Sequence, residues 1–346
     1  MTTIDLFAGP GGWDEGARSL GVTDIIGFDT SADACATAVA AGHRRNQGDV
    51  RELRFSDWLD ATGLIASPPC PTFSPSGLRS GLGDDYQAVL DVWTSIGWGA
   101  EVDQAMSCVD DVADPRTALL ALAGAWALAL PNLCWLAMEQ VHTVEFAWED
   151  LSAELFGAGW EWADVLTIDA ADFGLGSRRR RSYLLARRHS PSPNGFALSR
   201  KRSSMAATLG WPSGHEIVTR GNRRPTGGNR FSADKPAWCL TGSSRSWERD
   251  DGIRLTAAEA GQLVGFRPDY PWQGSRSSQF LQAADAVSPV MAAGILSAAL
   301  GAPNTTGRPH DGGPVHREKR TQPSTLTPRE LEMTRPDTTA ESVMHG

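Results

Sequence analysis

The sequence predicts an α/β fold with a doubly wound, mostly parallel sheet and a small irregular insert late in the chain. Three observations predict it. Short apolar strands alternate with helices along roughly the first 80 residues, a glycine-rich turn joins the first strand to the first helix, and the alternation breaks over 189–253 and then returns. The chain of 346 residues is 41% hydrophobic, which suffices for one large domain and a smaller one.

Local patterns predict the elements in order. Apolar runs bounded by Gly, Asp and Pro are typical of buried strands, and longer Ala- and Leu-rich runs with a polar cap are typical of helices. Thr256 opens one helix, with Glu259 at its capping-box position. We expect strands over 2–7, 24–29, 64–67, 133–139, 160–169 and 181–187, and helices over 14–21, 31–42, 116–130, 147–159, 254–266 and 288–301.

Composition divides the chain into four expected segments. A large α/β domain covers 1–188, and an insert rich in Pro, Gly, Ser and Arg covers 189–253. Residues 254–301 return to the large domain, and the Pro-, Thr-, Arg- and Glu-rich tail 302–346 is expected to be disordered. The pattern of the Gly- and Asp-rich stretch 77–115 does not decide whether this stretch is ordered.

The five cysteines are scattered along the chain and form no CxxC pair. Such a set argues against a disulfide framework and against a zinc site, so we expect no metal and a reducing, cytoplasmic compartment. The N-terminal "MTTIDLF" lacks the basic flank and long apolar core of a signal peptide, and the apolar run over 117–130 is too short to span a bilayer. The sequence therefore indicates no membrane role.

The charge of the chain is unevenly distributed. The net charge is −9, but residues 177–254 carry 17 Lys and Arg against 5 Asp and Glu, a local +12 that leaves −21 for the rest. Trp211, Phe231, Trp238 and Trp247 are interleaved with these basic residues. A basic segment with interleaved aromatic residues favours a surface that faces a polyanion, so we expect a nucleic-acid partner.

A glycine loop follows the first strand. "DLFAGPGG" places Gly9, Gly11 and Gly12 there, where glycines let the backbone approach a ligand and the next helix offers unpaired N–H groups. A plain tight turn would look the same, but two carboxylates lie in neighbouring loops. Asp29 ends the second strand, where it could accept ribose hydroxyls, and Asp49 lies near the end of the third, where it could accept from an adenine amino group. Three such loops at one sheet edge predict an adenosyl pocket.

A single thiol lies in a proline-rich loop. "LIASPPCPTFSPSG" places Cys70 among Pro68, Pro69, Pro71 and Pro75. Because prolines donate no backbone hydrogen bond and fix their own φ, the strand must stop here and the thiol must sit on a stiffened loop. A small hydrophobic residue in a turn is the alternative interpretation.

These motifs, in this order, resemble those of the DNA (cytosine-5)-methyltransferase family, from residue 4 to about residue 300. "IDLFAGPGG" resembles the first motif of the family, "SPPCPTFSPSG" its nucleophile loop, "MEQV" its Glu-Asn-Val element and "FGLGSRRRR" its Gln-x-Arg-x-Arg element. "RLTAAEAGQLVGF" is similar to the motif after the recognition domain. The chain departs from the family at Pro71, at Gln140 and at Ser177. The largest departure is "QAADAV", where Gln-x-Gly-Asn-x-Val is expected and a loop with Ala284 and Asp285 is predicted.

The resemblance implies an enzyme, a DNA (cytosine-5-)-methyltransferase, which takes its methyl group from S-adenosylmethionine and acts on duplex DNA. Segment 1–188 then corresponds to the catalytic domain that binds S-adenosylmethionine, and 189–253 to the target-recognition domain. We expect a cytoplasmic monomer that contributes to DNA methylation, as in restriction-modification, and needs neither a metal nor a membrane.

The resemblance also assigns roles to residues. Carbon 5 of cytosine is a poor nucleophile until a thiolate adds at carbon 6, which implies Cys70 as the covalent catalyst on a flipped-out base. Glu139 would act as an acid at N3, Arg181 would bind the base oxygen, and Arg179 would order a loop or bind a phosphate. Positive charge from either arginine would favour the thiolate. The expected cofactor residues are Phe7, Gly9, Gly11, Gly12, Asp29, Asp49, Pro69 and Asp285, and the expected DNA-binding residues are Arg223, Arg224, Arg230 and Arg245.

Two other functions fit the same scaffold. An RNA cytosine methyltransferase is one, although the long basic insert favours duplex DNA. A catalytically inert DNA-binding protein is the other, and the departure at Ala284 and Asp285 is the feature that supports it. Methyl transfer to duplex DNA, compared with transfer to tRNA, would separate all three.

Overall fold

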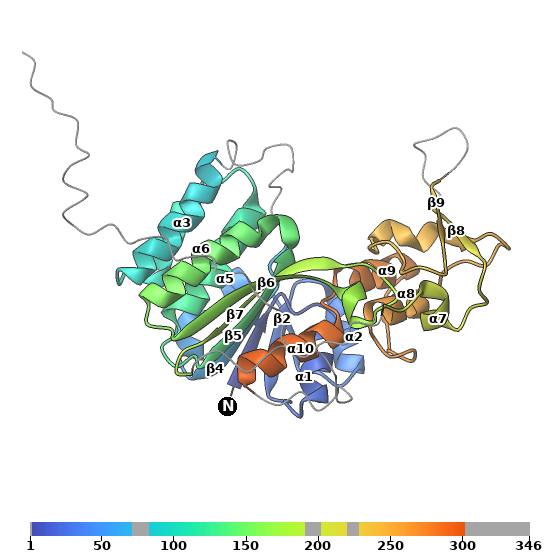
Figure 1. Cartoon of the computed structure of the whole chain (residues 1–346). Helices are drawn as coiled ribbons and strands as arrows, with labels where there is room; N and C mark the ends of the chain where they lie inside the picture. Colours follow the sequence, from blue (N-terminus) through green and yellow to red (C-terminus); the bar gives the residue numbers. More distant parts are fainter. Residues whose placement is uncertain (1, 71–82, 191–201, 220–227, 302–346) are drawn as a thin grey trace, which may run out of the picture. The chain divides into compact units, whose positions relative to one another are not determined.

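The computed structural model describes residues 2–70, 83–190, 202–219 and 228–301. Its centre is a seven-stranded sheet in the order β3-β2-β1-β4-β5-β7-β6 (Figure 1). β7 pairs antiparallel with both of its neighbours, and the other neighbouring strands run parallel to each other. The predicted mostly parallel, doubly wound α/β sheet is therefore confirmed. Its strands are β1 (Thr2–Leu6), β2 (Ile25–Asp29), β3 (Arg45–Gln47), β4 (Ala61–Ala66), β5 (Trp135–Val141), β6 (Trp162–Asp169) and β7 (Arg180–Arg187).

Both faces of the sheet are covered, which explains why its strands are apolar without interruption. Along β4, Leu64 and Ala66 belong to the core on one face while Ile65 belongs to the core on the other. The first face packs against helices between β4 and β6, and the second packs against α1 and α10, which lie side by side (Figure 1). These helices are α3 (Gly83–Gly97), α4 (Val102–Met106), α5 (Pro115–Ala129) and α6 (Glu145–Gly157) on the first face, and α1 (Gly12–Ser19) and α10 (Pro289–Leu300) on the second.

A second hydrophobic core lies in the region of the insert. Its small sheet has the order β10-β8-β9, and its cluster of buried residues includes Ile217, Trp247, Leu263 and Phe280. The last two belong to α8 and α9, so these helices share a core with the insert, whereas α10 packs on the large sheet. The elements are α7 (Met205–Leu209), β8 (Glu216–Thr219), β9 (Arg230–Ser232), β10 (Trp247–Arg249), α8 (Ala257–Val264) and α9 (Arg276–Asp285).

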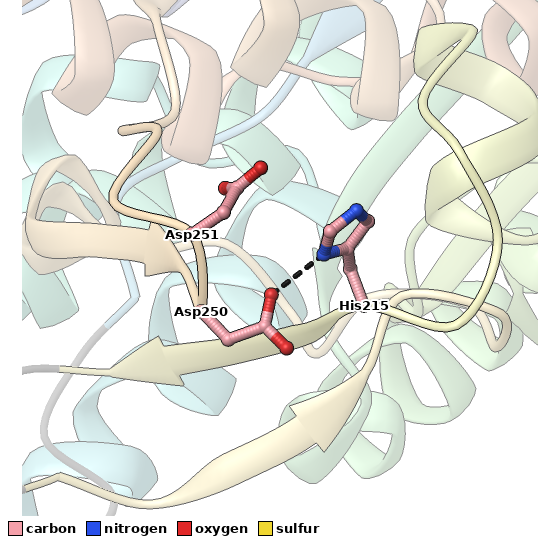
Figure 2. Close-up of side chains that lie close together, drawn as sticks. All are labelled: His215, Asp250 and Asp251. Atoms are coloured by element: carbon pink, nitrogen blue, oxygen red, sulfur yellow. Dashed lines mark hydrogen bonds and ion pairs between the residues drawn. The ribbon is translucent and has the colours of Figure 1, made fainter.

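A histidine–carboxylate pair ties this small sheet together. His215 Nδ1 lies 2.6 Å from Asp250 Oδ1, which joins the start of β8 to the turn after β10 (Figure 2). This hydrogen bond lowers the pKa of Asp250. The neighbouring Asp251 instead accepts hydrogen bonds from Arg249 Nε and Nη2, which lower its pKa to about 2. The three side chains are close enough to bind a cation together, but the guanidinium beside Asp251 disfavours one there.

The structure goes beyond the sequence expectations at one place and corrects them at another. The Gly- and Asp-rich stretch contains helices α3 and α4, where none was predicted. The prediction of a loop at "QAADAV" was wrong, because α9 continues to Asp285. With alanine in place of glycine, nothing in this sequence favours an earlier break of the helix.

The stretch Arg276–Leu300 is apolar and long enough to cross a membrane, but 83% of its apolar window is buried within the protein. It comprises α9 and α10, each of which contributes to one of the cores just described. We therefore assign both helices to the interior of the fold.

Candidate active site

A cavity of about 650 Å³ lies where the loops after β1, β2, β4 and β5 meet. Parallel strands place their carboxyl ends at one edge of a sheet, so these loops are brought together by the fold itself. Most of the predicted catalytic and cofactor residues line the cavity, namely Phe7, Gly9, Gly12, Asp29, Asp49, Pro69, Cys70, Glu139, Arg179, Arg181 and Asp285.

The glycine loop is bound to the end of β2 by one carboxylate. Asp29 Oδ2 accepts from the N–H of Gly9 at 2.8 Å, and Oδ1 accepts from the N–H of Ser31 at 2.8 Å. A carboxylate has about four acceptor positions, so some remain for a ligand. Phe7 has a φ of 63°, a strained value for a residue with a side chain, at the start of the loop.

Gly11 does not line the cavity, and packing explains why it is a glycine. Its φ is +107°, and a Cβ there would lie 2.7 Å from His43 Cδ2 and 2.9 Å from the Tyr270 hydroxyl oxygen. Gly12 is equally confined, because a Cβ would lie 2.0 Å from the carbonyl oxygen of Val287. At Gly9, by contrast, no atom lies within 4 Å of the Cβ position, so this residue leaves space for a ligand.

Asp49 lies on the cavity wall, but an arginine occupies much of its carboxylate. Arg51 donates from its backbone N–H at 2.9 Å, from Nε at 3.0 Å and from Nη2 at 2.5 Å. These hydrogen bonds lower the pKa of Asp49. Arg51 also lines the cavity, so the two residues act there as a pair that the sequence did not predict.

Side chains from two elements bind the loop segment that leads from β4 to Cys70. Gln140 is buried at the end of β5, and its Nε2 donates to the carbonyl oxygen of Pro68 at 2.8 Å. Trp13 Nε1 of α1 donates to Ser67 Oγ at 2.8 Å. The backbone on the amino side of Cys70 is therefore held from two directions.

The thiol of Cys70 is half-buried, and burial raises its pKa. The positive charges of Arg116 and Arg181 oppose this increase, whereas the negative charges of Asp114 and Glu139 add to it. Arg179 and Arg181 were expected to favour the thiolate, and Arg181 is the one that acts on Cys70. Arg116 also acts on Cys70 but was not predicted.

Glu139 lies between the two predicted arginines. Its Oε1 is 3.0 Å from Arg181 Nε and 3.7 Å from Arg179 Nη2. Arg179 is buried, and it donates to the carbonyl oxygens of Ala284 at 2.5 Å and of Asp285 at 3.0 Å. Carbonyl groups at the end of a helix lack partners within the helix, so Arg179 anchors the end of α9 beside the cavity. These contacts fit the ordering role rather than a phosphate contact.

Of the predicted DNA-binding arginines, Arg230 and Arg245 do not line this cavity. Arg230 is exposed and pairs with Glu216 at 3.2 Å. Arg245 is exposed and donates to the carbonyl oxygen of Gly242 at 2.7 Å. Arg223 and Arg224 lie outside the described residues, as does the tail 302–346.

The first 95 residues match the family model for the C-5 cytosine-specific DNA methylase. These residues include the glycine loop, Asp29 and Cys70, and their order agrees with the geometry just described. This N-terminal part of the chain is similar to the C-5 cytosine-specific DNA methylase family.

Curated methyltransferases are similar to the chain beyond this N-terminal part. Type II methyltransferase M.AplI of Arthrospira platensis is 25% identical over 90% of this chain and 89% of its own length. Type II methyltransferase M1.HphI of Haemophilus parahaemolyticus is 24% identical over 87% of both chains. Type II methyltransferase M.AgeI of Thalassovita gelatinovora is 29% identical, over 53% of this chain and 39% of its own length.

Solved structures of methyltransferases have the same fold as this chain. The Entamoeba histolytica methyltransferase EhMeth aligns with a TM-score of 0.60 at 15% identity, covering 87% of this chain and 98% of that one. The DNMT2 of Spodoptera frugiperda aligns with a TM-score of 0.59 at 15% identity, covering 87% and 100%. These likenesses support the methyltransferase fold of the sheet and its helices.

Proposed function

We propose that this protein transfers a methyl group from S-adenosylmethionine to carbon 5 of cytosine in duplex DNA, through a transient covalent bond between Cys70 Sγ and carbon 6. The match to the family model and the similarity to type II methyltransferases support methyl transfer to cytosine. One observation supports the rest most strongly. A single cavity contains the glycine loop with Asp29, as well as the thiol of Cys70 and the Glu139–Arg181 pair.

The residues of the cavity fit S-adenosylmethionine. Gly9 leaves open space, Asp29 retains acceptor capacity, and α1 begins at an N-cap glycine that provides no side-chain cap for its first N–H groups. Phe7, Asp49, Pro69 and Asp285 would complete this part of the cavity. When bound, S-adenosylmethionine supplies the electrophilic methyl group.

Cys70 would provide the nucleophile. Its thiolate forms a bond to carbon 6, and electrons of the ring shift toward N3, which leaves an enamine whose carbon 5 is nucleophilic. After methylation of carbon 5, loss of the proton from that carbon to water re-forms the double bond and releases the thiolate. The sulfur therefore ends the cycle as it began.

Glu139 and Arg181 would act on the base itself. Glu139 is buried beside the thiol, where it can make the hydrogen bond at N3 that accompanies addition at carbon 6. Arg181 would bind the base oxygen, because its guanidinium lies on the same cavity wall. Arg179 would act indirectly, by anchoring the end of α9.

A base stacked in a duplex cannot reach Cys70, so the base must be flipped out. We assign this step, with target recognition, to residues 189–253, and DNA contacts to Arg223, Arg224, Arg230 and Arg245. Segments 1–188 and 254–301 would form the catalytic part, although α8 and α9 share their core with the recognition part. We further propose that the protein works as a cytoplasmic monomer without a metal, within a restriction-modification or related system.

Nucleoside mass spectrometry of DNA from cells that express the protein tests this function. We expect 5-methylcytosine above the level in cells without the protein. In vitro, purified protein should methylate duplex DNA in preference to tRNA. Preferential methylation of tRNA would assign the enzyme to RNA, and folded protein that binds S-adenosylmethionine without methylating either would indicate an inert DNA-binding protein.

A further inference from the structure

We propose that Arg45 is the positioning residue of the glycine loop. From β3 it binds Ala8 at the start of the loop and Asp14 in the first turn of α1, and in this way it fixes the segment that holds S-adenosylmethionine. The inference rests on the proposed binding of S-adenosylmethionine and extends it to a residue that does not line the cavity.

The register of three neighbouring parallel strands brings Arg45 beneath the loop. Asp5 of β1 pairs with Gly27 of β2, and Gly27 pairs with Arg45 of β3. Side chains of residues aligned in this way lie on the same face of the sheet. A Cβ at Gly27 would lie 1.3 Å from Arg45 Nη1 and 2.8 Å from the Cβ of Ala8. The absence of a side chain at Gly27 therefore opens the space through which Arg45 reaches the loop.

The guanidinium connects the two ends of the loop. Arg45 Nη2 donates to Asp14 Oδ2 at 2.7 Å and to the carbonyl oxygen of Ala8 at 3.5 Å. The side chain of Arg45 is completely buried and that of Asp14 is 5% exposed, so water screens this ion pair little. The start of the loop and the start of α1 are thus bound to one group on β3.

The contact from β3 adds to contacts that come from β2. The N–H of Ala8 donates to the carbonyl oxygen of Phe28 at 2.9 Å, and the N–H of Gly9 donates to Asp29 Oδ2 at 2.8 Å. These two hydrogen bonds bind residues 8 and 9 but not α1. Arg45 binds both the loop and the helix, so it sets the position of one relative to the other.

The guanidinium is a costly group at this place. Among the described residues, its Nε and Nη1 have no hydrogen-bond partner, and neither carboxylate oxygen of the aligned Asp5 has one. An apolar side chain would fill the space over Gly27 without leaving buried polar groups unpaired, and such replacements of buried ion pairs are often neutral or stabilising. Packing alone would therefore favour an apolar residue, which supports a role for Arg45 in placing the loop.

The test measures the binding of S-adenosylmethionine by isothermal titration calorimetry and steady-state methylation of duplex DNA with S-adenosylmethionine varied. The double variant Asp14→Asn/Arg45→Met removes both charges, so neither partner stays buried and unpaired. We expect its Kd and KM for S-adenosylmethionine to rise roughly three- to tenfold, because the loop must then be ordered on binding. At saturating S-adenosylmethionine, kcat should stay within roughly twofold of the wild type.

Arg45→Lys keeps the charge but lacks the planar guanidinium, so its Kd should lie between those of the wild type and the double variant. Arg249→Met is the matched control. Arg249 is also a buried arginine, 8% exposed and paired with Asp251, but it lies in β10 of the small sheet. This variant should leave the Kd and the KM for S-adenosylmethionine unchanged.

Wild-type affinity for S-adenosylmethionine in the double variant, whatever its melting temperature, would overturn the inference. A lower kcat with an unchanged KM would also overturn it, because that result indicates a general loss of folded protein. Wild-type protein that binds no S-adenosylmethionine would overturn the proposed function and the inference with it. The two failures can therefore be distinguished by the wild-type titration.

Discussion

At the scale of single residues, Asp29 combines structural and ligand-binding capacity. Its carboxylate already connects the glycine loop to the start of α2 (Ala32–Ala40) through Gly9 and Ser31. The same carboxylate is proposed to bind the ribose of S-adenosylmethionine. A substitution should therefore act on cofactor binding before it acts on anything else.

We predict that Asp29→Ala weakens the binding of S-adenosylmethionine by about 1–3 kcal/mol, because backbone and ligand donors lose their acceptor. DNA affinity measured without cofactor should hardly change. Asp24→Ala, which alters a surface ion pair with Arg44, is the control and should leave both unchanged. Isothermal titration calorimetry and a DNA-binding assay check this, and an equal loss of both affinities in Asp29→Ala would contradict the assigned role.

A second residue-scale prediction concerns pH. Asp5 is fully buried in β1, its carboxylate has no hydrogen-bond partner, and burial with the nearby charge of Asp14 raises its pKa well above the ordinary value. A raised pKa means that the folded protein keeps this proton longer than the unfolded chain does. The contribution of Asp5 to stability is therefore lost as pH rises from about 4 through the pKa of the folded state.

Asp5→Asn imitates the protonated carboxyl and should remove this dependence. We expect the melting temperature of the variant, relative to that of the wild type, to increase as pH rises from about 4 toward neutral. Thermal melts of both proteins at matched ionic strength measure the difference. A difference that stays constant with pH would mean that Asp5 is not protonated in the folded protein.

The sequence identified single residues well where local signals determine their position. Prolines fixed the place of Cys70, and the end of β2 fixed that of Asp29. It did not identify Arg51 or Arg116. Both line the cavity, but only the fold brings them to its wall, and no local sequence signal marks that position as chemical. For Arg116 one signal existed, since "DPR" is typical of the start of a helix and therefore of a position at the sheet edge.

At the scale of elements, the hydrogen bond between Gln140 and Pro68 connects β5 to the nucleophile loop. The sequence presented Gln140 only as a departure from the family's asparagine. In the structure the side-chain oxygen of Gln140 also accepts from the N–H of Val141 at 2.7 Å, so both the nitrogen and the oxygen of the amide have a hydrogen-bond partner. Gln140 therefore makes a contact that positions the loop.

We predict that Gln140→Leu lowers kcat by at least tenfold and destabilises the protein by about 1–3 kcal/mol, because buried polar groups lose their partner. Gln140→Asn should retain more activity, since a shorter amide can make part of the contact. Binding of S-adenosylmethionine should change little in either variant. Steady-state kinetics and thermal melts check this, and wild-type kcat in Gln140→Leu would show that the contact does not position the loop.

Most strands and helices were predicted within a few residues, because a covered parallel sheet gives long apolar runs separated by capped helices. Helices were not predicted where local composition gave no helical signal. The Gly- and Asp-rich stretch forms α3, whose Val89, Val92 and Trp93 are completely buried. Such burial depends on tertiary packing, which composition does not reveal. α9 was not among the predicted helices, and the family pattern suggested a loop at its end.

At the scale of the whole molecule, net positive charge is concentrated in the region assigned to recognition. We predict that replacing Arg223, Arg224, Arg230 and Arg245 by Gln together weakens DNA binding and flattens its salt dependence, by up to roughly 0.9 units of log–log slope for each lost phosphate contact. Fluorescence anisotropy across a salt series measures the slope. The double variant Arg44→Gln/Arg54→Gln removes exposed charge elsewhere and should leave it unchanged.

The division between the two parts of the molecule was only partly visible in the sequence. The loss of apolar periodicity marked the start of the insert, but α8 and α9 have ordinary helical patterns and gave no sign that they share its core. The distinction arises from which cluster a helix packs against. α9 packs in the core of the recognition part, and its end lies beside the cavity, where Arg179 anchors it.

The covalent role of Cys70 is the central claim, and one measurement tests it most directly. Duplex DNA with 5-fluorocytosine at the target should form a stable adduct with the wild-type protein in the presence of S-adenosylmethionine, because fluorine cannot leave carbon 5 as a proton does. Mass spectrometry should locate the adduct on Cys70. Cys70→Ala should form none and should not methylate DNA, whereas Cys108→Ala, which removes an exposed thiol, should still form it. An adduct on another residue, or methylation by Cys70→Ala, would contradict the mechanism.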